Sequence, residues 1–341
     1  MRITNVRAVQ PATPGSPPDW RTTFGQVLVA VETDSGLTGY GVGGGGPAAL
    51  YVIDTVLRDS LMGVDPDPVE ALWTNMYNAT LVFGRKGLAI MALSGVDLAL
   101  WDLRAKAVGK PVAVLLGGTV GQPIPAYATL SAGMGAPLPD GFGAFKVHAR
   151  MLSDGSPDAV IQEVERVRLA AGPDAELMVD FFMSLNVDRT LELAPRLAEL
   201  DVRWLEEPLF PDDWAGYARL SRESPVPVAG GEHEFTATAF QHLIDQRLHT
   251  VLQPDVCWCG GMTELVKIYA AAAKAGLRVC PHRGAEPWGL HAIAALDPQP
   301  LAESGRPWMN WVGGPEIEDG HVTLGNAPGF GVNVDASLFD D

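Results

Sequence analysis

Five side chains that can bind metal ions or transfer protons recur at nearly even spacing in the second half of the chain. Asp180, Glu206, Glu232, Asp255 and His282 follow one another at intervals of 26, 26, 23 and 27 residues. One strand–helix unit of an eight-unit barrel has about this length. Acids that converge at one mouth of such a barrel require a cation. A carboxylate that orients a histidine is suited to proton transfer near neutral pH.

Each of these residues ends a short apolar run, as is typical of a buried strand. The five runs are 176–180, 202–206, 226–232, 250–255 and 277–282. Helical patterns separate the runs, most clearly at 158–171 and 263–275. Weaker runs at 124–129, 143–148 and 301–303 complete a series of eight strands. This alternation predicts a parallel β/α architecture, in which the C-terminal strand ends share one catalytic face.

The N-terminal third has a different pattern. Segments 3–9, 25–32 and 38–42 alternate like strands of an antiparallel sheet, and helical periodicity dominates from about 50 to 108. Strands followed by helices predict an α+β domain. The glycine cluster 43–46 lacks the strand–turn–helix context of a phosphate-binding loop, so we expect a flexible loop there.

Composition narrows the classes of function. The net charge of −17 argues against a nucleic-acid partner and against an anionic membrane surface. Three cysteines (Cys257, Cys259 and Cys280) cannot form a disulfide framework, and they suit a reducing compartment. No apolar run approaches the roughly 20 residues of a membrane span. We therefore predict a cytoplasmic protein without nucleic-acid or membrane partners.

Several short motifs, taken together, resemble one protein family. They are Lys146-Val-His148, Met178-Val-Asp180, Trp204-Leu-Glu206-Glu-Pro208, Gly231-Glu232-His233, Gln253-Pro-Asp255 and Pro281-His282. This set resembles the mandelate racemase subgroup of the enolase superfamily, over nearly the whole chain. Segments 180–184, 253–261 and 328–331 are most similar to acid-sugar dehydratases of the L-rhamnonate type. The chain departs from them in being shorter and in carrying His148 where we expect a residue that cannot accept a proton.

The resemblance implies a modified TIM barrel, (β/α)7β, with an α+β capping domain built from the N-terminal region and the C-terminal tail. We place the capping domain at 1–118, the barrel at 119–310 and the returning segment at 311–341. By analogy with the family, we also expect a homo-oligomer.

The resemblance also implies roles for individual residues. Asp180, Glu206 and Glu232 would hold Mg²⁺, and a set of carboxylates without thiolates is consistent with such a hard ion. His282 would be the general base, oriented by Asp255. Lys146 would add a second positive contact, and Glu303 would be a hydrogen-bonding partner on the far side of the substrate.

Four further residues are candidates for substrate contact or catalysis. His148 shares a strand face with Lys146, so it can be a second base, a substrate contact or a hydrogen-bonded filler. His233 can approach the substrate or support the metal ligands. Trp20 and Arg21 lie in an early loop that would cover the barrel mouth in this family, where they would contact a polyol or carboxylate. Apart from these four, Glu286, Trp288 and His291 follow the strand that ends at His282 and can help to shape the pocket.

These residues favour a Mg²⁺-dependent lyase that dehydrates an aldonic or aldaric acid. Abstraction of the α-proton would pass through an enediolate and give a 2-keto-3-deoxy acid. The alternatives are a racemase or epimerase that uses His148 and His282, a lactonising enzyme with the same intermediate, and a noncatalytic sugar-acid binding protein on the same scaffold.

Overall fold

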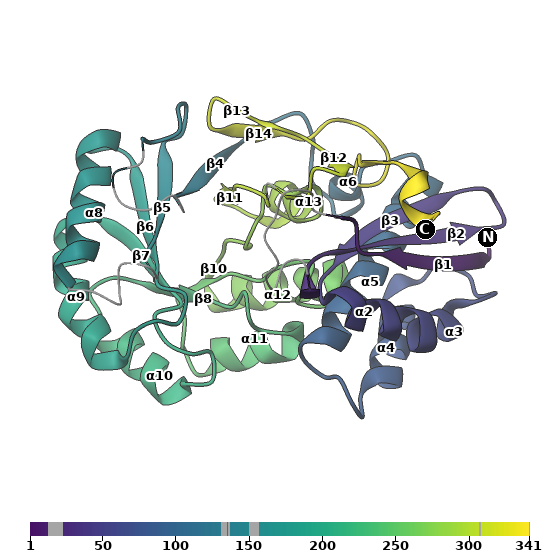
Figure 1. Ribbon diagram of the computed structural model, residues 1–341, viewed down its shortest axis with the longest axis horizontal. Helices are drawn as coiled ribbons and strands as arrows, with labels where there is room; N and C mark the ends of the chain where they lie inside the picture. The colour runs from purple at the N-terminus through teal and green to yellow at the C-terminus, as the bar shows by residue number, and fades with distance from the viewer. Residues whose placement is uncertain (13–22, 131–134, 136, 150–156, 307, 341) are drawn as a thin grey trace.

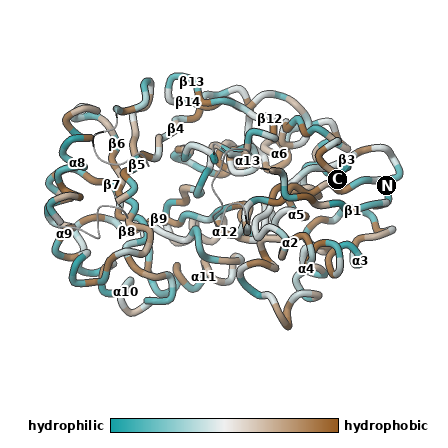
Figure 2. Tube along the Cα trace, in the orientation of Figure 1, coloured by the Kyte–Doolittle hydropathy of each residue, from teal (hydrophilic) through white to brown (hydrophobic). Residues whose placement is uncertain are grey.

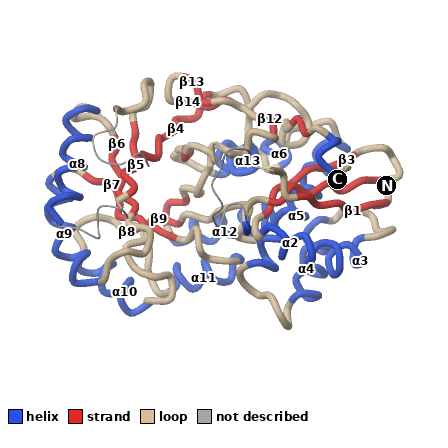
Figure 3. The backbone as a smooth tube through the Cα atoms, in the orientation of Figure 1, coloured by secondary structure: helices blue, strands red, loops and turns tan. Residues whose placement is uncertain are grey.

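The structure is a computed structural model of the 341-residue chain, and it describes all residues except 13–22, 131–134, 136, 150–156, 307 and 341. Two units lie side by side along the long axis of the molecule (Figure 1). One is a small antiparallel sheet with helices, close to both chain termini, and the other is a set of parallel strands with helices outside them (Figure 3).

The N-terminal unit packs a long helix directly on a three-stranded sheet. Its strands are β1 (Ile3–Val9), β2 (Val27–Thr33) and β3 (Thr38–Gly43). Its helices are α2 (Gly46–Val52), the π-helix η1 (Ile53–Leu57), α3 (Arg58–Leu61), α4 (Val69–Thr80), α5 (Leu88–Ala107) and α6 (Val112–Leu115). Three glycines on one face of β3 allow α5 to approach the strand closely. A Cβ at Gly39, Gly41 or Gly43 would meet a backbone oxygen of α5 at 2.1–2.3 Å.

The barrel unit contains eight strands that run in the same direction. They are β4 (Pro123–Leu130), β5 (Ala144–His148), β6 (Glu176–Asp180), β7 (Val202–Glu206), β8 (Val228–Gly230), β9 (Val251–Leu252), β10 (Arg278–Val279) and β11 (Ala302–Glu303). Parallel pairing links β4 through to β10 in sequence order, and β11 pairs with β4. Cys280, which follows β10, donates through Sγ to the carbonyl of Leu301, which precedes β11, at 3.6 Å.

Six helices follow successive barrel strands from β5 to β10. They are α8 (Pro157–Ala171), α9 (Val187–Glu199), α10 (Trp214–Glu223), α11 (Thr236–Asp245), α12 (Gly261–Ala275) and α13 (Pro287–Leu296). Local signals explain their limits. Asn186 caps α9 by accepting a hydrogen bond from the backbone N–H of Arg189, and Gly276 ends α12 in the left-handed conformation. Between β4 and β5, the described residues 135 and 137–143 form no helix. The predicted fold class is confirmed.

The C-terminal tail returns first to the barrel and then to the N-terminal sheet. Its elements are β12 (Val312–Gly313), β13 (Ile317–Glu318), β14 (His321–Thr323), β15 (Asn333–Val334) and the 3-10 helix η2 (Ala336–Phe339). Strand β14 pairs antiparallel with the start of β4. Farther along, Phe339 stacks on Tyr40 of β3, with ring centroids 6.4 Å apart. The domain limits at 118 and 310 stay a prediction.

The capping unit and the barrel share a continuous apolar core. Buried side chains of α4 and α5 belong to the same cluster as buried side chains of α11, α12 and α13, and Figure 2 shows hydrophobic stretches along these segments. Two indole N–H groups cross the boundary: Trp73 donates to the carbonyl of Gly260 at 2.8 Å, and Trp101 donates to Thr263 Oγ1 at 2.9 Å. The cap is therefore held on the barrel by packing as well as by hydrogen bonds.

The glycine cluster 43–46 corrects one expectation. It is not a flexible loop but a buried bend between β3 and α2. A Cβ at Gly44 would lie 2.7 Å from the indole nitrogen of Trp258, and a Cβ at Gly46 would lie 2.3 Å from the carbonyl oxygen of Thr23. The glycines are needed because other chain segments approach the backbone closely. None of the described helices has the length and apolar character needed to span a membrane.

Candidate active site

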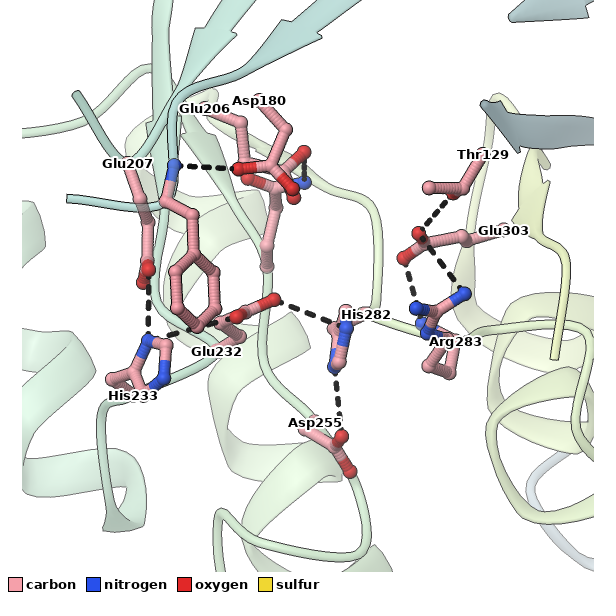
Figure 4. A network of polar contacts seen from close by, with 12 residues as sticks. Thr129, Asp180, Glu206, Glu207, Glu232, His233, Asp255, His282, Arg283 and Glu303 are labelled. Atoms are coloured by element: carbon pink, nitrogen blue, oxygen red, sulfur yellow. Dashed lines mark hydrogen bonds and ion pairs between the residues drawn. The ribbon is translucent and has the colours of Figure 1, made fainter. Parts of the chain in front are cut away.

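Three carboxylates project from the ends of adjacent barrel strands. Asp180 and Glu206 are the last residues of β6 and β7 and are direct register partners, whereas Glu232 lies two residues beyond β8. Their exposed fractions are 5%, 2% and 6%. Figure 4 shows Asp180 and Glu206 close together, and Glu232 pointing toward His282. The even spacing in the sequence therefore becomes a cluster at one mouth of the barrel.

Lys146 lies in the middle of this cluster. Its Nζ atom donates to Glu206 Oε1 at 2.5 Å, lies 2.9 Å from Glu303 Oε1, and is 3.8 Å from Asp180 Oδ2. The residue is 1% exposed. Burial alone would lower the pKa of this ammonium, but the surrounding carboxylates outweigh burial and hold the pKa well above its usual value. Lys146 is therefore a fixed positive charge in the site.

One ammonium does not compensate the buried acids. Burial raises the pKa values of Asp180, Glu206 and Glu232, and neighbouring carboxylates raise them further, against the opposing effect of Lys146 or His282. A divalent cation would relieve this repulsion, and three carboxylates without a thiolate are donors that Mg²⁺ prefers. The residues present therefore fit a magnesium ion. Gln253 Nε2 donates to Glu206 Oε2 at 2.6 Å and orients that carboxylate.

A different set of ligand atoms is the one drawn closely together in the described residues. Single ligand atoms of Glu207, Glu232 and His233 lie within 4.8 Å of one another. However, His233 Nδ1 is 2.8 Å from Glu207 Oε2, so these two groups already satisfy each other. The strand-end set offers oxygen donors only, which suits a hard cation better than a mixed set with imidazole. We therefore favour Asp180, Glu206 and Glu232 as the metal ligands.

His282 is held by one carboxylate and faces another. Its Nδ1 is 2.8 Å from Asp255 Oδ2, and its Nε2 is 3.1 Å from Glu232 Oε2. The Asp255 contact assigns the proton to Nδ1 in the neutral ring and leaves Nε2 free to accept one. Burial lowers the pKa of the imidazole, but Glu232 and Asp255 outweigh burial and raise it overall. This geometry suits proton transfer at Nε2.

Glu303 is fully buried on the side of the site formed by β4 and β11 (Figure 4). It accepts hydrogen bonds from Thr129 Oγ1 at 2.6 Å and from the backbone N–H of Arg283 at 2.9 Å, in addition to its contact with Lys146. Burial would raise the pKa of this carboxyl, but Lys146 and Arg283 hold it well below its usual value. Glu303 is therefore an ionised anchor beside Lys146.

The two other predicted histidines border the same cluster. His148 Nε2 is 3.9 Å from Asp180 Oδ2, and its ring lies 5.8 Å from that of Phe182. The ring of His233 lies 5.6 Å from that of Phe182 and 6.1 Å from that of Trp258. The structure thus brings both near the acids. Trp20 and Arg21 lie outside the described residues.

Sequence reasoning missed several residues that hold the site together. Thr129, Gln253, Arg283 and Arg306 each donate to a carboxylate of the cluster or of the Asp255–His282 pair. Gln253 begins the recognised motif Gln253-Pro-Asp255 and Arg283 directly follows Pro281-His282, which was a usable signal. Arg306 offered none, because it is 51 residues from Asp255 and follows the last barrel strand. The aromatic walls Phe182 and Trp258 were not singled out either.

Comparisons with known proteins agree with this architecture. The family model for the mandelate racemase / muconate lactonizing enzyme N-terminal domain matches residues 4–117, and the enolase C-terminal domain-like model matches residues 134–338. An L-rhamnonate dehydratase from Saccharopolyspora erythraea is 38% identical over 293 residues, which cover 82% of this chain and 73% of that protein.

Solved structures show the same fold with different reactions. L-talarate dehydratase from Polaromonas sp. JS666, complexed with Mg and L-glucarate, is 28% identical with a TM-score of 0.88 over 99% of this chain and 96% of that chain. The 3,6-anhydro-D-galactonate cycloisomerase from Zobellia galactanivorans is 28% identical with a TM-score of 0.87 over 100% and 99%. With both family models and a relative of this similarity, the chain belongs to the mandelate racemase / muconate lactonizing enzyme family of the enolase superfamily.

Proposed function

We propose that this protein is a Mg²⁺-dependent hydro-lyase that converts an acid sugar, an aldonic or aldaric acid resembling L-rhamnonate, into a 2-keto-3-deoxy acid. The observation that carries the proposal is the Asp255–His282 pair, whose second ring nitrogen, Nε2, faces a buried cluster of three strand-end carboxylates and Lys146. The similarity to an L-rhamnonate dehydratase and to an L-talarate dehydratase supports dehydration as the reaction.

Asp180, Glu206 and Glu232 would hold the magnesium ion. When bound, Mg²⁺ supplies positive charge that stabilises the negative charge developing on the substrate carboxylate as the α-proton leaves. Lys146 contributes a second fixed positive charge, which is preorganised by Glu206 and Glu303 and excluded from water.

His282 carries the proton in both halves of the reaction. Its Nε2 takes the hydrogen from the carbon next to the carboxylate, while Asp255 stabilises the resulting imidazolium. The same nitrogen then returns a proton to the hydroxyl on the neighbouring carbon, so that the C–O bond breaks and water leaves. The enol product tautomerises to the 2-keto-3-deoxy acid. One proton is removed and one is returned, which leaves His282 ready for the next turnover.

The remaining predicted residues would bind the substrate. We assign His148 and His233 to contacts with its hydroxyl groups, since both lie beside Phe182 at the edge of the acid cluster. Trp20 and Arg21 stay predictions from the sequence for the segment that would cover the mouth.

One observation favours racemisation or epimerisation as a second candidate. His148 lies beside Asp180 and His282 lies beside Glu232, so two imidazoles border the proposed metal ligands. Burial, together with the nearby Lys146 charge, lowers the pKa of His148, which keeps its ring neutral and able to accept a proton. Two such bases, one on each face of a carbon acid, could invert its configuration.

A substrate screen tests the proposal directly. The purified protein with Mg²⁺ would be incubated with a library of aldonic and aldaric acids, and 2-keto-3-deoxy products would be detected as semicarbazones. We expect turnover of at least one acid sugar and no product from the His282→Asn variant. No product across the library in the presence of Mg²⁺ would contradict dehydration.

Incubation in D₂O separates the alternatives. Exchange of the α-hydrogen for deuterium without loss of water would identify a racemase or epimerase. Binding of an acid sugar that is equally tight in the wild type and in His282→Asn, without exchange or product in either protein, would identify a binding protein.

A further inference from the structure

A buried ion pair that the mechanism above does not use lies against Asp255. Arg306, in the segment after β11, donates through Nη2 to Asp255 Oδ2 and through Nη1 to Glu286 Oε2 at 2.6 Å. The backbone N–H of Arg306 also donates to Glu286 Oε1 at 2.8 Å. Glu286 therefore accepts hydrogen bonds from both the backbone N–H and the guanidinium of Arg306. These two bonds fix the position of the backbone and of the side-chain end.

This arrangement is enclosed on all sides. The side chains of Arg306 and Asp255 are 2% and 1% exposed, and that of Glu286 is 6% exposed. The guanidinium carbon lies 5.4 Å from the centre of the Trp258 ring, and that ring is 5.9 Å from the ring of His282. Gly305 leaves room for Glu286, because a Cβ there would come within 2.9 Å of Glu286 Cγ. A buried guanidinium cannot move freely without losing charged partners.

Asp255 is the point at which this pair meets the proposed base. Its Oδ1 accepts the backbone N–H of Cys257 at 2.8 Å, whereas Oδ2 accepts from both His282 Nδ1 and Arg306 Nη2. The oxygen that orients the imidazole is thus the oxygen held by the guanidinium. Burial would raise the pKa of Asp255, but Arg306 and His282 lower it overall, so the carboxylate stays ionised.

We infer that Arg306, anchored by Glu286, is a positioning residue for proton transfer: it fixes Asp255 Oδ2 and, through it, the direction in which His282 Nε2 points. The expected loss of kcat rests on the proposed function, whereas the orientation of His282 by Arg306 does not. An arginine suits this task better than a lysine, because its planar fork binds two carboxylates at defined angles. Small errors in the placement of a base cost a large part of the rate.

The kinetic test uses Arg306→Met, Arg306→Lys and Glu286→Gln, with Arg219→Met as the matched control. Arg219 is 44% exposed and pairs with the surface acids Asp188 and Glu223. We expect Arg306→Met to lower kcat by about 100-fold, with KM and the Mg²⁺ affinity nearly unchanged, because the lost interaction matters for the transition state. Glu286→Gln keeps one acceptor for Arg306, so its kcat should fall by about tenfold. Arg219→Met should match the wild type.

Rescue separates positioning from simple loss of structure. Compared with Arg306→Met, the Arg306→Lys variant should have a higher kcat, and guanidinium ion added to Arg306→Met should also raise kcat. A merely structural role predicts that the melting temperature recovers but kcat does not. If Arg306→Met does not fold, Glu286→Gln decides the question. A kcat within about threefold of wild type in folded Arg306→Met or Glu286→Gln would overturn the inference, as would a rise in KM alone.

A spectroscopic readout keeps the inference separate from the proposed function. In protein with ¹⁵N-labelled histidine, the Nδ1–H signal of His282 would be assigned by its loss in His282→Asn. We expect this signal to broaden or disappear in Arg306→Lys and Glu286→Gln and to remain in Arg219→Met. If the signal changes as expected but no acid sugar is turned over, the proposed function fails and the positioning holds. An unchanged signal would overturn the positioning role whatever the substrate.

Discussion

The two ring nitrogens of His282 have different roles: Nδ1 orients the ring and Nε2 would transfer the proton. Nδ1 is held by Asp255 at 2.8 Å, and Nε2 lies 3.1 Å from Glu232 Oε2. Replacing His282 with Asn should lower turnover by about 10²–10⁴-fold, the usual contribution of a general acid–base group. Isothermal titration should show that Mg²⁺ still binds. The exposed His321, replaced by Asn in the same way, serves as the control, and equal losses in the two variants would contradict the assignment of the base.

Replacing Asp180 should raise thermal stability without metal and remove the stabilisation by Mg²⁺. Because burial raises the pKa of this carboxyl, its ionised form is unfavourable in the folded protein without metal. Asp180→Asn removes the charge and can keep the hydrogen bond that Asp180 Oδ1 accepts from the backbone N–H of Phe182. The variant should therefore melt at a higher temperature than the wild type in EDTA.

The same variant should lose the response to magnesium. Wild-type protein should gain about 2.7 kcal/mol of unfolding free energy at a Mg²⁺ concentration 100-fold above its Kd. Asp180→Asn should gain little. Thermal melts of both proteins, with EDTA and with Mg²⁺, measure the two effects. An undiminished Mg²⁺ shift in Asp180→Asn would instead favour the group formed by Glu207, Glu232 and His233.

At the scale of elements, the sequence predicted the strands that position the site better than it predicted their ends. Strands β6 and β7 have the predicted limits, 176–180 and 202–206, because neither contains a proline or a glycine that would interrupt the strand. The three strands after them are shorter than predicted. Pro254 and Pro281 precede Asp255 and His282, and a proline cannot donate to a strand ladder. Gly231 ends β8 before Glu232 for a different reason, because its φ of 122° lies outside the strand conformation.

Other features of the site could not be predicted from local patterns. The contacts of Arg306 with Asp255 and of Lys146 with Glu303 join residues far apart in the chain, and no periodicity encodes them. The glycines at 43–46 indicated flexibility in the sequence, yet they serve the close approach of Trp258 and of the backbone at Thr23. Tertiary contacts, rather than local conformational preference, decide such positions.

Asp97 joins the capping unit to the barrel at the start of α12. It is fully buried on α5, where its two oxygens accept from the backbone N–H of Thr263 at 3.0 Å and from Thr263 Oγ1 at 2.6 Å. Burial raises the pKa of Asp97 to about 7, an effect that the bonds from Thr263 only partly oppose. The folded protein thus holds a proton here that the unfolded chain releases near pH 4.

This linkage predicts how stability changes with pH. Between about pH 4 and pH 7 the folded state binds more protons at Asp97 than the unfolded state, so stability falls as pH rises and levels off above pH 7. Asp97→Asn cannot titrate. The unfolding free energy of Asp97→Asn, relative to that of wild type, should rise by about 4 kcal/mol between pH 4 and pH 7. This value corresponds to a pKa difference of about three between the folded and unfolded states. Denaturant unfolding at several pH values measures the difference, and a difference independent of pH would show that Asp97 is ionised in the folded protein.

At the scale of the whole molecule, the cap and the barrel should unfold together. One hydrophobic cluster contains buried side chains of both units, and Trp73 and Trp101 donate across the boundary. We expect a single thermal transition that coincides for tryptophan fluorescence and far-ultraviolet circular dichroism. Trp73→Phe removes the bond to Gly260 and should lower the unfolding free energy by about 1–3 kcal/mol without splitting the transition. Two separate transitions would contradict a shared core.

Assembly and location belong to the same scale and stay predictions from the sequence. Homo-oligomerisation is tested by light scattering on the eluted protein, and the cytoplasmic location by fractionation of the producing cells.

The measurement that most directly tests the proposed chemistry is proton NMR of an acid sugar, found in the substrate screen, during incubation with the protein in D₂O. We predict that the signal of the hydrogen next to the carboxylate disappears as a 2-keto-3-deoxy acid forms, and that it persists with EDTA or with His282→Asn. Loss of that signal at the wild-type rate in His282→Asn, or in wild-type protein without a divalent ion, would contradict proton abstraction by His282 at a magnesium site.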